Sequence, residues 1–325
     1  MSDAIPHAQN EVANVQPLIP PVCKERMAEE VARAMADHGP IVGQGAFDVF
    51  ICQANGIPNI LREIGRLREL SFRAVGEGTG RELDLDVFDE HYLHIFVWHR
   101  EQREVVGSYR LGRTDLILAE FGGQGLYTST LFEFSSAFLD FLNPALEVGR
   151  SFVAPAWQKS IHPLALLWRG MATFASRHPR YARLFGPVSI SDDYSSLSRD
   201  IMVTYLRRER SNAMCSGWVS PRNPYFPSSG EEISRNLRSI EEVSAAVSSV
   251  EPDGKGVPVL LRQYAKLNAT LLEFNVDPDF GSVLDALVLV DLREAPAHAL
   301  TRHMGREGYL SFAAAHGLDL SKSRL

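Results

Sequence analysis

The order of apolar segments along the chain predicts an α+β fold, with a mixed, mostly antiparallel β-sheet and helices on both faces. Strand-like segments alternate with segments of helical periodicity from residue 47 to residue 292. A chain of 325 residues is long enough for one large domain or two small ones. No linker-like break interrupts the series of strands, which favours one domain with an N-terminal arm.

The elements of the N-terminal half follow from composition and spacing. Residues 1–22 are polar and rich in proline, which is typical of a flexible arm. Pro58 stands near the start of a segment whose apolar residues recur at helical spacing. The expected elements are a helix over 23–38 ended by Gly39 and Pro40, a strand over 47–54, a helix over 58–75, a glycine-rich acidic loop over 76–90, and paired strands over 92–99 and 104–113.

The C-terminal half continues the alternation. Asp192 or Asp193 is expected to cap a helix, and the polar segment 211–235 is interpreted as an insertion or surface loop. The expected strands cover 145–153, 183–191, 271–277 and 283–292, and the expected helices cover 162–178, 192–210, 239–250, 257–269 and 297–316. The chain therefore divides into an arm with a short helix (1–40), one sheet domain (41–295) with an insertion at 211–240, and a helical tail (296–325).

Composition and charge exclude several classes of protein. The net charge of −7 argues against a nucleic-acid partner. The three cysteines have no spacing typical of a disulfide framework or a metal site, so we expect no bound metal and a location in the reducing cytoplasm. The first residues lack the basic and apolar regions of a signal peptide. No apolar run reaches the ~20 residues that span a bilayer, so contact with the inner membrane could only be peripheral.

The segment 84–92 (DLDVFDEHY) crowds four carboxylates in front of the apolar run LHIFVW. Carboxylates at such spacing repel one another, so the segment costs stability unless a cation lies nearby. That cation is either a neighbouring arginine or the amine of a substrate. The alternative is a solvated acidic loop, which is the commoner reason for a run of charge.

Five short motifs lie on the expected elements: Arg68-x-x-x-Phe72, Asp86-x-x-Asp89, Arg110 in GSYR, Glu147-x-x-Arg150, and His94 together with LLWRG at 166–170. In this arrangement the chain resembles the GCN5-related N-acyltransferase (GNAT) superfamily over residues 45–295. Within it, the resemblance is to the branch that holds acyl-homoserine-lactone synthases and the "hemolysin-like" N-acyltransferases of ornithine and glycine lipids. The lactone synthases carry a tryptophan in the first loop, where this chain has Gly76–Gly80, which argues against a homoserine lactone product.

The resemblance implies a GNAT-like N-acyltransferase. It would move a long, 3-hydroxylated acyl chain from acyl carrier protein to the amine of an amino acid and so form a lyso-aminolipid. No cofactor is implied, because the phosphopantetheine arm of the carrier enters as a co-substrate. Two alternatives stay open: a soluble synthase of N-acyl amino acids or lactone-like signals, and a catalytically silent protein that binds acyl carriers.

Acyl transfer to an amine needs a base for the ammonium proton and N–H donors for the thioester oxygen. Glu147 is the expected base, because an unpaired carboxylate within a strand is costly. Its alternative role is an ion pair with Arg110 or Arg150, although residues three apart on a strand point to opposite faces, which argues against the second pair. His94 and Asp89 are further candidate catalytic residues, and a hydrogen-bonded core histidine is the alternative for His94.

The acidic segment and the arginines together suit an amino acid acceptor. Asp86 and Asp89 would form a cage with Arg68 and Arg110, in which carboxylates hold the ammonium and an arginine holds the carboxylate. The candidate acceptor-binding residues are Arg68, Phe72, Asp86, Arg110 and Arg150.

The donor side departs from the superfamily pattern. Other members bind the pyrophosphate of coenzyme A with a glycine-containing loop at a helix N-terminus. The corresponding segment here, QKSIHP (158–163), has no glycine and ends in a proline without an N–H, which argues for the single phosphate of an acyl carrier. Trp168 either lines an acyl channel or packs in the core. The candidate donor-binding residues are Val153, Gln158, Lys159, Ser160 and Trp168.

A basic cluster on this acidic protein contains Arg177, Arg180 and Arg183. With the arginines of 207–210 it could form a patch for an acidic carrier protein. The alternative is a solvated helix end, at which arginines stabilise the helix dipole.

Overall fold

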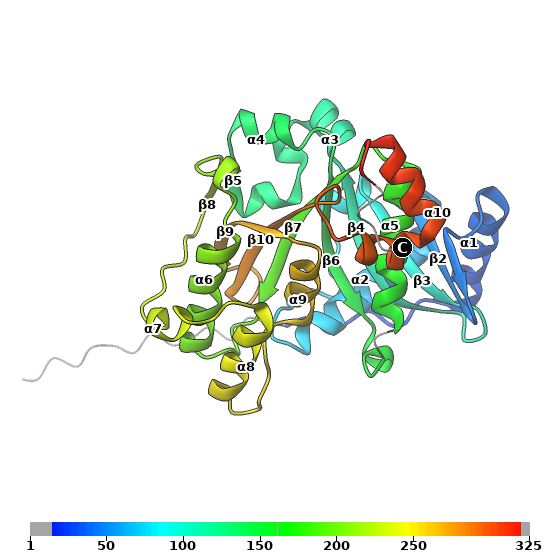
Figure 1. Cartoon of the computed structure of the whole chain (residues 1–325). Coiled ribbons are helices and arrows are strands. Elements are labelled where there is room, and N and C mark those ends of the chain that lie inside the picture. Colours follow the sequence, from blue (N-terminus) through cyan, green and yellow to red (C-terminus); the bar gives the residue numbers. More distant parts are fainter. Residues whose placement is uncertain (1–14, 161, 320–325) are drawn as a thin grey trace, which may run out of the picture.

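One eight-stranded sheet organises the chain in the computed structural model, which describes residues 15–160 and 162–319 (Figure 1). The strand order is β1-β2-β3-β4-β6-β7-β10-β9, and every neighbouring pair is antiparallel except the parallel pair β6 and β7. The bounds are β1 Val42–Gln44, β2 Phe47–Gln53, β3 Leu93–His99, β4 Glu104–Arg113, β6 Leu146–Val153, β7 Arg183–Ile190, β9 Thr270–Asp277 and β10 Val283–Asp291. The predicted fold class is confirmed.

Helices cover both faces of this sheet, because successive side chains of a strand point to opposite sides. In β3, Ile95 and Val97 belong to the core that α5, α6, α8, α9 and α10 share, whereas Phe96 and Trp98 pack with α1 and α2. The bounds are α1 Lys24–Asp37, α2 Pro58–Arg73, α5 His162–Arg177, α6 Ser196–Arg210, α8 Ile240–Val250, α9 Val259–Lys266 and α10 Ala297–Ala315. Within the described ranges, no helix is both long and apolar enough to cross a bilayer.

Several short elements were not predicted. They are β1, α3 Thr114–Phe121, β5 Phe132–Phe134, α4 Ser136–Phe141, β8 Val219–Pro221 and α7 Glu231–Ser234. Elements of three to eight residues show too little periodicity to be recognised. Because β8 pairs with β5, the segment 211–235 is more than a surface loop and contributes buried Cys215 and Val219 to a small core.

The predicted N-terminal cap of α6 differs from the structure. Ser195, not Asp192 or Asp193, caps α6, since its side chain accepts a hydrogen bond from the Ser198 N–H (3.2 Å).

The expected flexible arm does not extend over residues 15–22. Ile19 is buried, and the Val22 N–H donates to Glu63 Oε2 (3.0 Å). Residues 1–14, the rest of that expectation, lie outside the described residues.

The strands β6 and β7 diverge soon after they begin, and this divergence positions the site. Only Leu146 and Glu147 of β6 pair with β7. The two backbones touch at Gly186, where a side chain would overlap the Val148 carbonyl oxygen. The next residue of β7, Pro187, has no N–H with which to continue the ladder. The sheet therefore opens between the second halves of these strands.

Candidate active site

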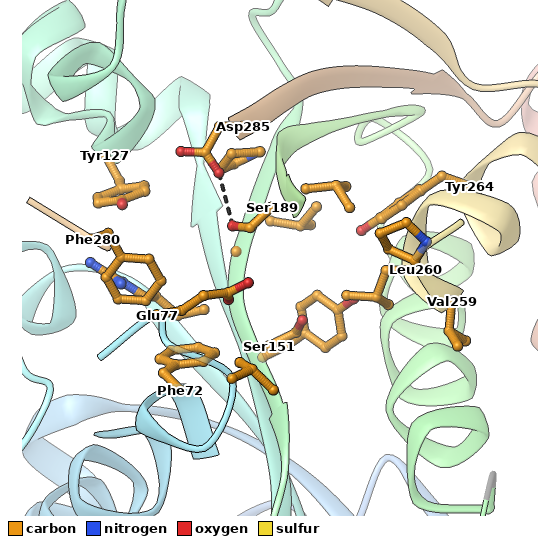
Figure 2. Close-up of a pocket in the computed structure, with 18 of the residues that line it drawn as sticks. Phe72, Glu77, Tyr127, Ser151, Ser189, Val259, Leu260, Tyr264, Phe280 and Asp285 are labelled. Carbon is orange, nitrogen blue, oxygen red and sulfur yellow. Dashed lines mark hydrogen bonds between the residues drawn. The ribbon is translucent and has the colours of Figure 1, made fainter. Parts of the chain in front are cut away.

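A cavity of about 450 Å³ fills the gap between β6 and β7 (Figure 2). Because the gap opens the sheet, residues from both faces line it. Figure 2 shows Tyr127 and Phe280 on one side, and Leu260 and Tyr264 of α9 on the opposite side. The volume is typical of small-molecule sites, and an opening through the sheet allows two substrates to meet from opposite faces.

Arg150 reaches this cavity from a bulge in β6. The register between β4 and β6 shifts there, with one extra residue on β6, and Arg150 adopts a left-handed conformation with φ of 50°. Its guanidinium lies over the rings of Tyr127 and Phe280, 4.8 and 4.7 Å from their centroids. Its ion-pair contacts to Asp84 (3.6 Å) and Asp86 (3.8 Å) are longer than charge-assisted hydrogen bonds. The guanidinium therefore keeps N–H donors for a bound carboxylate.

The acidic segment is neutralised inside the protein. Arg68 makes a bidentate pair with Asp89, with Nη1–Oδ1 and Nη2–Oδ2 distances of 3.0 and 2.8 Å. Arg110 Nη1 donates to Asp86 Oδ1 (2.6 Å), and Asp84 Oδ2 lies 3.2 Å from Arg68 Nε. Each aspartate therefore faces a guanidinium, and the expected contact between the acidic residues and the arginines is present.

These ion pairs remove the repulsion that crowded carboxylates would otherwise cause. Burial alone would raise the pKa of Asp89, but the guanidinium groups of Arg68 and Arg110 outweigh it and hold this pKa well below its usual range. Asp89 is therefore ionised, and the aspartates of the segment are paired with arginines rather than solvated.

The structure places only two of the five predicted acceptor-binding residues, Phe72 and Arg150, on the cavity wall. Asp86 and Asp89 were expected to hold a substrate ammonium. They lie behind the wall and hold arginines instead.

Glu147, the predicted base, is buried where β6 and β7 diverge. Tyr92 Oη donates to its Oε2, and the Thr128 N–H donates to its Oε1 (2.6 Å). Burial raises the pKa of Glu147, and these two hydrogen bonds oppose the shift. Tyr92 Oη also accepts the Tyr127 N–H (2.9 Å). The carboxyl of Glu147 does not line the cavity. Its contacts favour a role in positioning Tyr127 through Tyr92. The role of Glu147 as the base stays a prediction.

His94 lies behind the cavity wall. Its Nε2 is 2.8 Å from the Asp89 carbonyl oxygen, to which it can only donate. Burial lowers the pKa of His94 to about 4, although Asp89 opposes this, so the imidazole is neutral at pH 7. These contacts match the alternative of a hydrogen-bonded core histidine.

Two carboxylates that were not predicted line the cavity. Asp285 stands in the apolar strand β10 and accepts a hydrogen bond from Ser189 Oγ (2.8 Å), and Glu77 enters from the loop after α2 (Figure 2). Burial raises the pKa of each to about 7. The run VLDALVLVDL carries a signal that could have found Asp285, namely a carboxylate within an apolar strand. An unpaired carboxylate is as costly there as at Glu147.

A close approach of two loops brings Glu77 to the cavity. Gly281, in the turn between β9 and β10, has φ of 71°, and a side chain there would overlap the Gly76 carbonyl oxygen. The loop before Glu77 can therefore lie directly on the turn that precedes the strand of Asp285.

Of the predicted donor-binding residues, Gln158 lines the cavity, and its Nε2 donates to the Val153 carbonyl at the end of β6 (2.9 Å). Lys159 and Ser160 follow Gln158 and lead towards α5; residue 161 lies outside the described residues. Trp168 packs on α9 behind the cavity wall. Gln158 is therefore the residue of the predicted donor segment that the structure places at the cavity.

The predicted carrier-protein patch lies at the C-terminal end of α5, whereas Gln158 precedes the N-terminal end of this helix. Arg177 ends α5, whose 16 residues span about 24 Å. Arg180 pairs with Asp115 and Arg183 with Asp291, each at 3.4 Å. Arg180 and Arg183 thus have partners within the chain, and the expected contact with a carrier protein at this patch stays a prediction.

Comparisons with known proteins identify the family of the chain. Residues 67–169 match the GNAT acetyltransferase domain family. A glycine N(alpha)-acyltransferase of Bacteroides thetaiotaomicron is 30% identical over 307 residues, which cover 89% of this chain and 90% of the relative. A second one, from Phocaeicola vulgatus, is 27% identical and covers 89% of this chain and 93% of its own length. Among solved structures, a CoA-dependent acyl-homoserine lactone synthase has a TM-score of 0.36 and 12% identity over 83% of this chain and 89% of that one.

The fold, the open sheet and the matching family define an acyltransferase of the GNAT superfamily. Within it, the chain belongs to the family of N-acyltransferases that contains the two glycine N(alpha)-acyltransferases. The resemblance inferred from the sequence motifs is confirmed. The solved structure is too weakly similar to carry an argument about the site.

Proposed function

We propose that this N-acyltransferase moves a long, 3-hydroxylated acyl chain from acyl carrier protein to the α-amine of glycine. The product would be a lyso-aminolipid of the glycine-lipid type, made in the cytoplasm with peripheral contact at the inner membrane. The observation that carries the proposal is one cavity in which the Arg150 guanidinium accompanies two carboxylates, Glu77 and Asp285. A zwitterionic amino acid offers the complementary charges. Both relatives are named glycine N(alpha)-acyltransferases, which favours glycine as the acceptor.

The size of the cavity favours a small acceptor. About 450 Å³ must hold the acceptor together with the reacting end of the thioester. The rings of Phe72 and Phe280 are in edge-to-face contact (5.2 Å between centroids) and narrow the acceptor side. Glycine has no side chain and therefore leaves the most room for the thioester.

We infer direct attack of the amine on the thioester, without an acyl-enzyme. No cysteine lines the cavity, and burial raises the pKa of the Cys52 thiol to about 12, so its nucleophilic thiolate is scarce. The extra residue of the β6 bulge lacks a ladder partner, which leaves backbone N–H groups available to the oxyanion. The phosphopantetheine arm would lie between the diverging strands.

Acyl carrier thioesters should be used with a kcat/KM about tenfold or more above that of the matching coenzyme A thioesters. QKSIHP has no glycine and loses one N–H donor at Pro163, so it suits a pyrophosphate poorly, whereas a carrier brings a single phosphate and a protein surface. Steady-state kinetics with one acyl chain on carrier, coenzyme A and pantetheine measure this preference. Coenzyme A and pantetheine should perform alike; a coenzyme A thioester that equals the carrier would contradict the donor assignment.

Mass spectrometry of lipids from cells that overproduce the chain tests the function as a whole. N-acylglycine with a 3-hydroxylated chain should accumulate, and an Arg150→Met variant at equal expression is the matched control. Accumulation of a different N-acyl amino acid would change the acceptor, and the absence of any new N-acyl amino acid would contradict the proposal.

A further inference from the structure

The chain contains two groups of acidic residues near the cavity, and only one of them is neutralised. The aspartates of the acidic segment all face arginines. Glu77 and Asp285 line the cavity, and the buried Asp277 lies near Asp285. Among the described residues, none of these three carboxylates forms an ion pair, whereas most other buried acids of the chain do. The exceptions, Glu147 and Asp200, each accept at least two hydrogen bonds. The second group therefore needs a separate explanation.

A structural role does not explain Asp285. It is 3% exposed, and its strand neighbours Leu284 and Ala286 are fully buried. Among the described residues, its carboxylate accepts one hydrogen bond, from the Ser189 hydroxyl. A buried carboxylate without a cation is costly, and an apolar residue of similar size would fit this strand better. Unfavourable buried acids at a cavity mark functional sites.

The surroundings of this carboxylate indicate what it binds. Arg150 carries a positive charge on the same cavity, whereas Glu77 and Asp285 project into it with negative charge (Figure 2). The cation and the acids come from different elements, namely β6, the loop after α2, and β10. An occupant therefore meets a carboxylate site and an ammonium site in one space, as an α-amino acid requires.

We propose that Glu77 and Asp285 form the ammonium site for the amino acid acceptor, and that Asp285 is the base that takes its proton. This inference rests on the proposed function and names the residues that replace Asp86, Asp89 and Glu147 in the roles first expected of them.

The acceptor nitrogen loses two protons during the transfer. Asp285 takes one proton from the ammonium, which leaves a neutral amine with a free electron pair. The amine nitrogen forms a bond to the thioester carbonyl carbon, and the C–S bond breaks. The nitrogen then loses a second proton, which the leaving thiolate takes up, so the products are an amide and a free thiol. Asp285 returns its proton to solvent.

The charged groups around Asp285 suit this task. Burial raises its pKa to about 7; Asp277 and Glu77 add to the shift, and the Ser189 hydroxyl and Arg150 oppose it. For Glu77, burial is again the main cause, and Asp193 adds to it. A base with a pKa near 7 is partly ionised at neutral pH and still binds a proton well. The kcat/KM of the wild type should therefore rise with pH through about 7.

Asp285→Asn and Glu77→Gln test the inference. Asp285→Asn should lower kcat by roughly 10²–10⁴, the usual share of a general base, with the KM for the donor unchanged. It should also remove the rise of kcat/KM near pH 7. Glu77→Gln should mainly raise the KM for glycine. Glu101→Gln, an exposed acid in the turn after β3, is the matched control with unchanged kinetics.

Thermal melting distinguishes a functional acid from a structural one. Because the pKa of Asp285 is higher in the folded than in the unfolded chain, its protonated form stabilises the fold at low pH, and this stabilisation is lost as the pH rises through about 7. Asp285→Asn should therefore melt above the wild type at pH 8, and the difference should shrink at pH 5. A variant that melts well below the wild type at pH 8 would show a structural role and overturn the inference.

The remaining outcomes separate this inference from the proposed function. If the wild type acylates glycine and Asp285→Asn keeps kcat within about threefold, the inference fails alone. A large loss in Glu147→Gln under the same conditions would restore Glu147 as the base. If the chosen donor gives no turnover, calorimetry tests whether Asp285 binds the amine. The wild type should bind glycine more tightly than glycolate, which lacks the amine. Asp285→Asn should lose that preference. Equal preferences would overturn the inference.

Discussion

Replacing Arg150 with methionine is expected to lower kcat/KM for glycine by roughly 10²–10³-fold, because truncating one partner of a buried charge pair costs about 2–5 kcal/mol. The guanidinium is the cation that lines the cavity beside the acids, and its contacts to Asp84 and Asp86 are long. The substrate carboxylate would lose its partner, whereas the fold would keep the shorter pairs of Arg68 and Arg110. Steady-state kinetics with glycine and melting temperatures measure both effects.

Methylamine and Arg26→Met supply the controls. Methylamine lacks the carboxylate, so it should be a poor acceptor for the wild type and equally poor for Arg150→Met. Arg26 is exposed on α1 and does not line the cavity, so its variant should match the wild type with glycine. An Arg150→Met enzyme that still prefers glycine to methylamine as strongly as the wild type would show that the carboxylate binds elsewhere.

Asp89→Asn should destabilise the fold by about 3–5 kcal/mol, because it leaves buried guanidinium groups without their charge partner. Arg68 and Asp89 are nearly inaccessible to solvent and joined by two hydrogen bonds. This expectation reverses the one from sequence, in which neutralising a crowded carboxylate relieves repulsion. Chemical denaturation of the purified variant at pH 7 measures the loss, with the m-value as a check on the unfolded state.

Asp86→Asn and a double variant sharpen this test. The Asp86 side chain is 18% exposed, so its variant should cost less than Asp89→Asn. Arg68→Met combined with Asp89→Leu should cost less than the sum of the two single changes, because each single change leaves the other charge buried and unpaired. An Asp89→Asn chain as stable as the wild type would mean that the network does not hold the fold.

The main elements of the fold could be predicted because their side chains repeat a pattern over many residues. The helix α2 and the strands β3 and β4 were expected within a few residues of their bounds, and the residues that face the two cores alternate along β3 as strand geometry requires. Short elements such as β1 and β8 carry no such repeat, and their pairing depends on distant segments.

The site was predicted in part. Arg150 and the charge network were found because motif spacing placed them on known elements. The separation of roles within the network was not predictable, because it depends on which charges pair across the fold. Arg68 and Asp89 are 21 residues apart, and Arg110 joins them from strand β4. Glu77 reaches the cavity only because Gly281 admits its loop, which no local pattern reveals.

The cavity between β6 and β7 is expected to join an acyl chain to the amine of an amino acid. The product of a purified reaction shows whether it does so, when the reaction contains the protein, a 3-hydroxyacyl thioester of acyl carrier protein, and glycine labelled with ¹⁵N. We expect an N-acylglycine that carries the label in its amide, one free carrier thiol for each product, and no product with Arg150→Met. Release of the free fatty acid alone, or an acyl group left on the protein by intact mass, would contradict it.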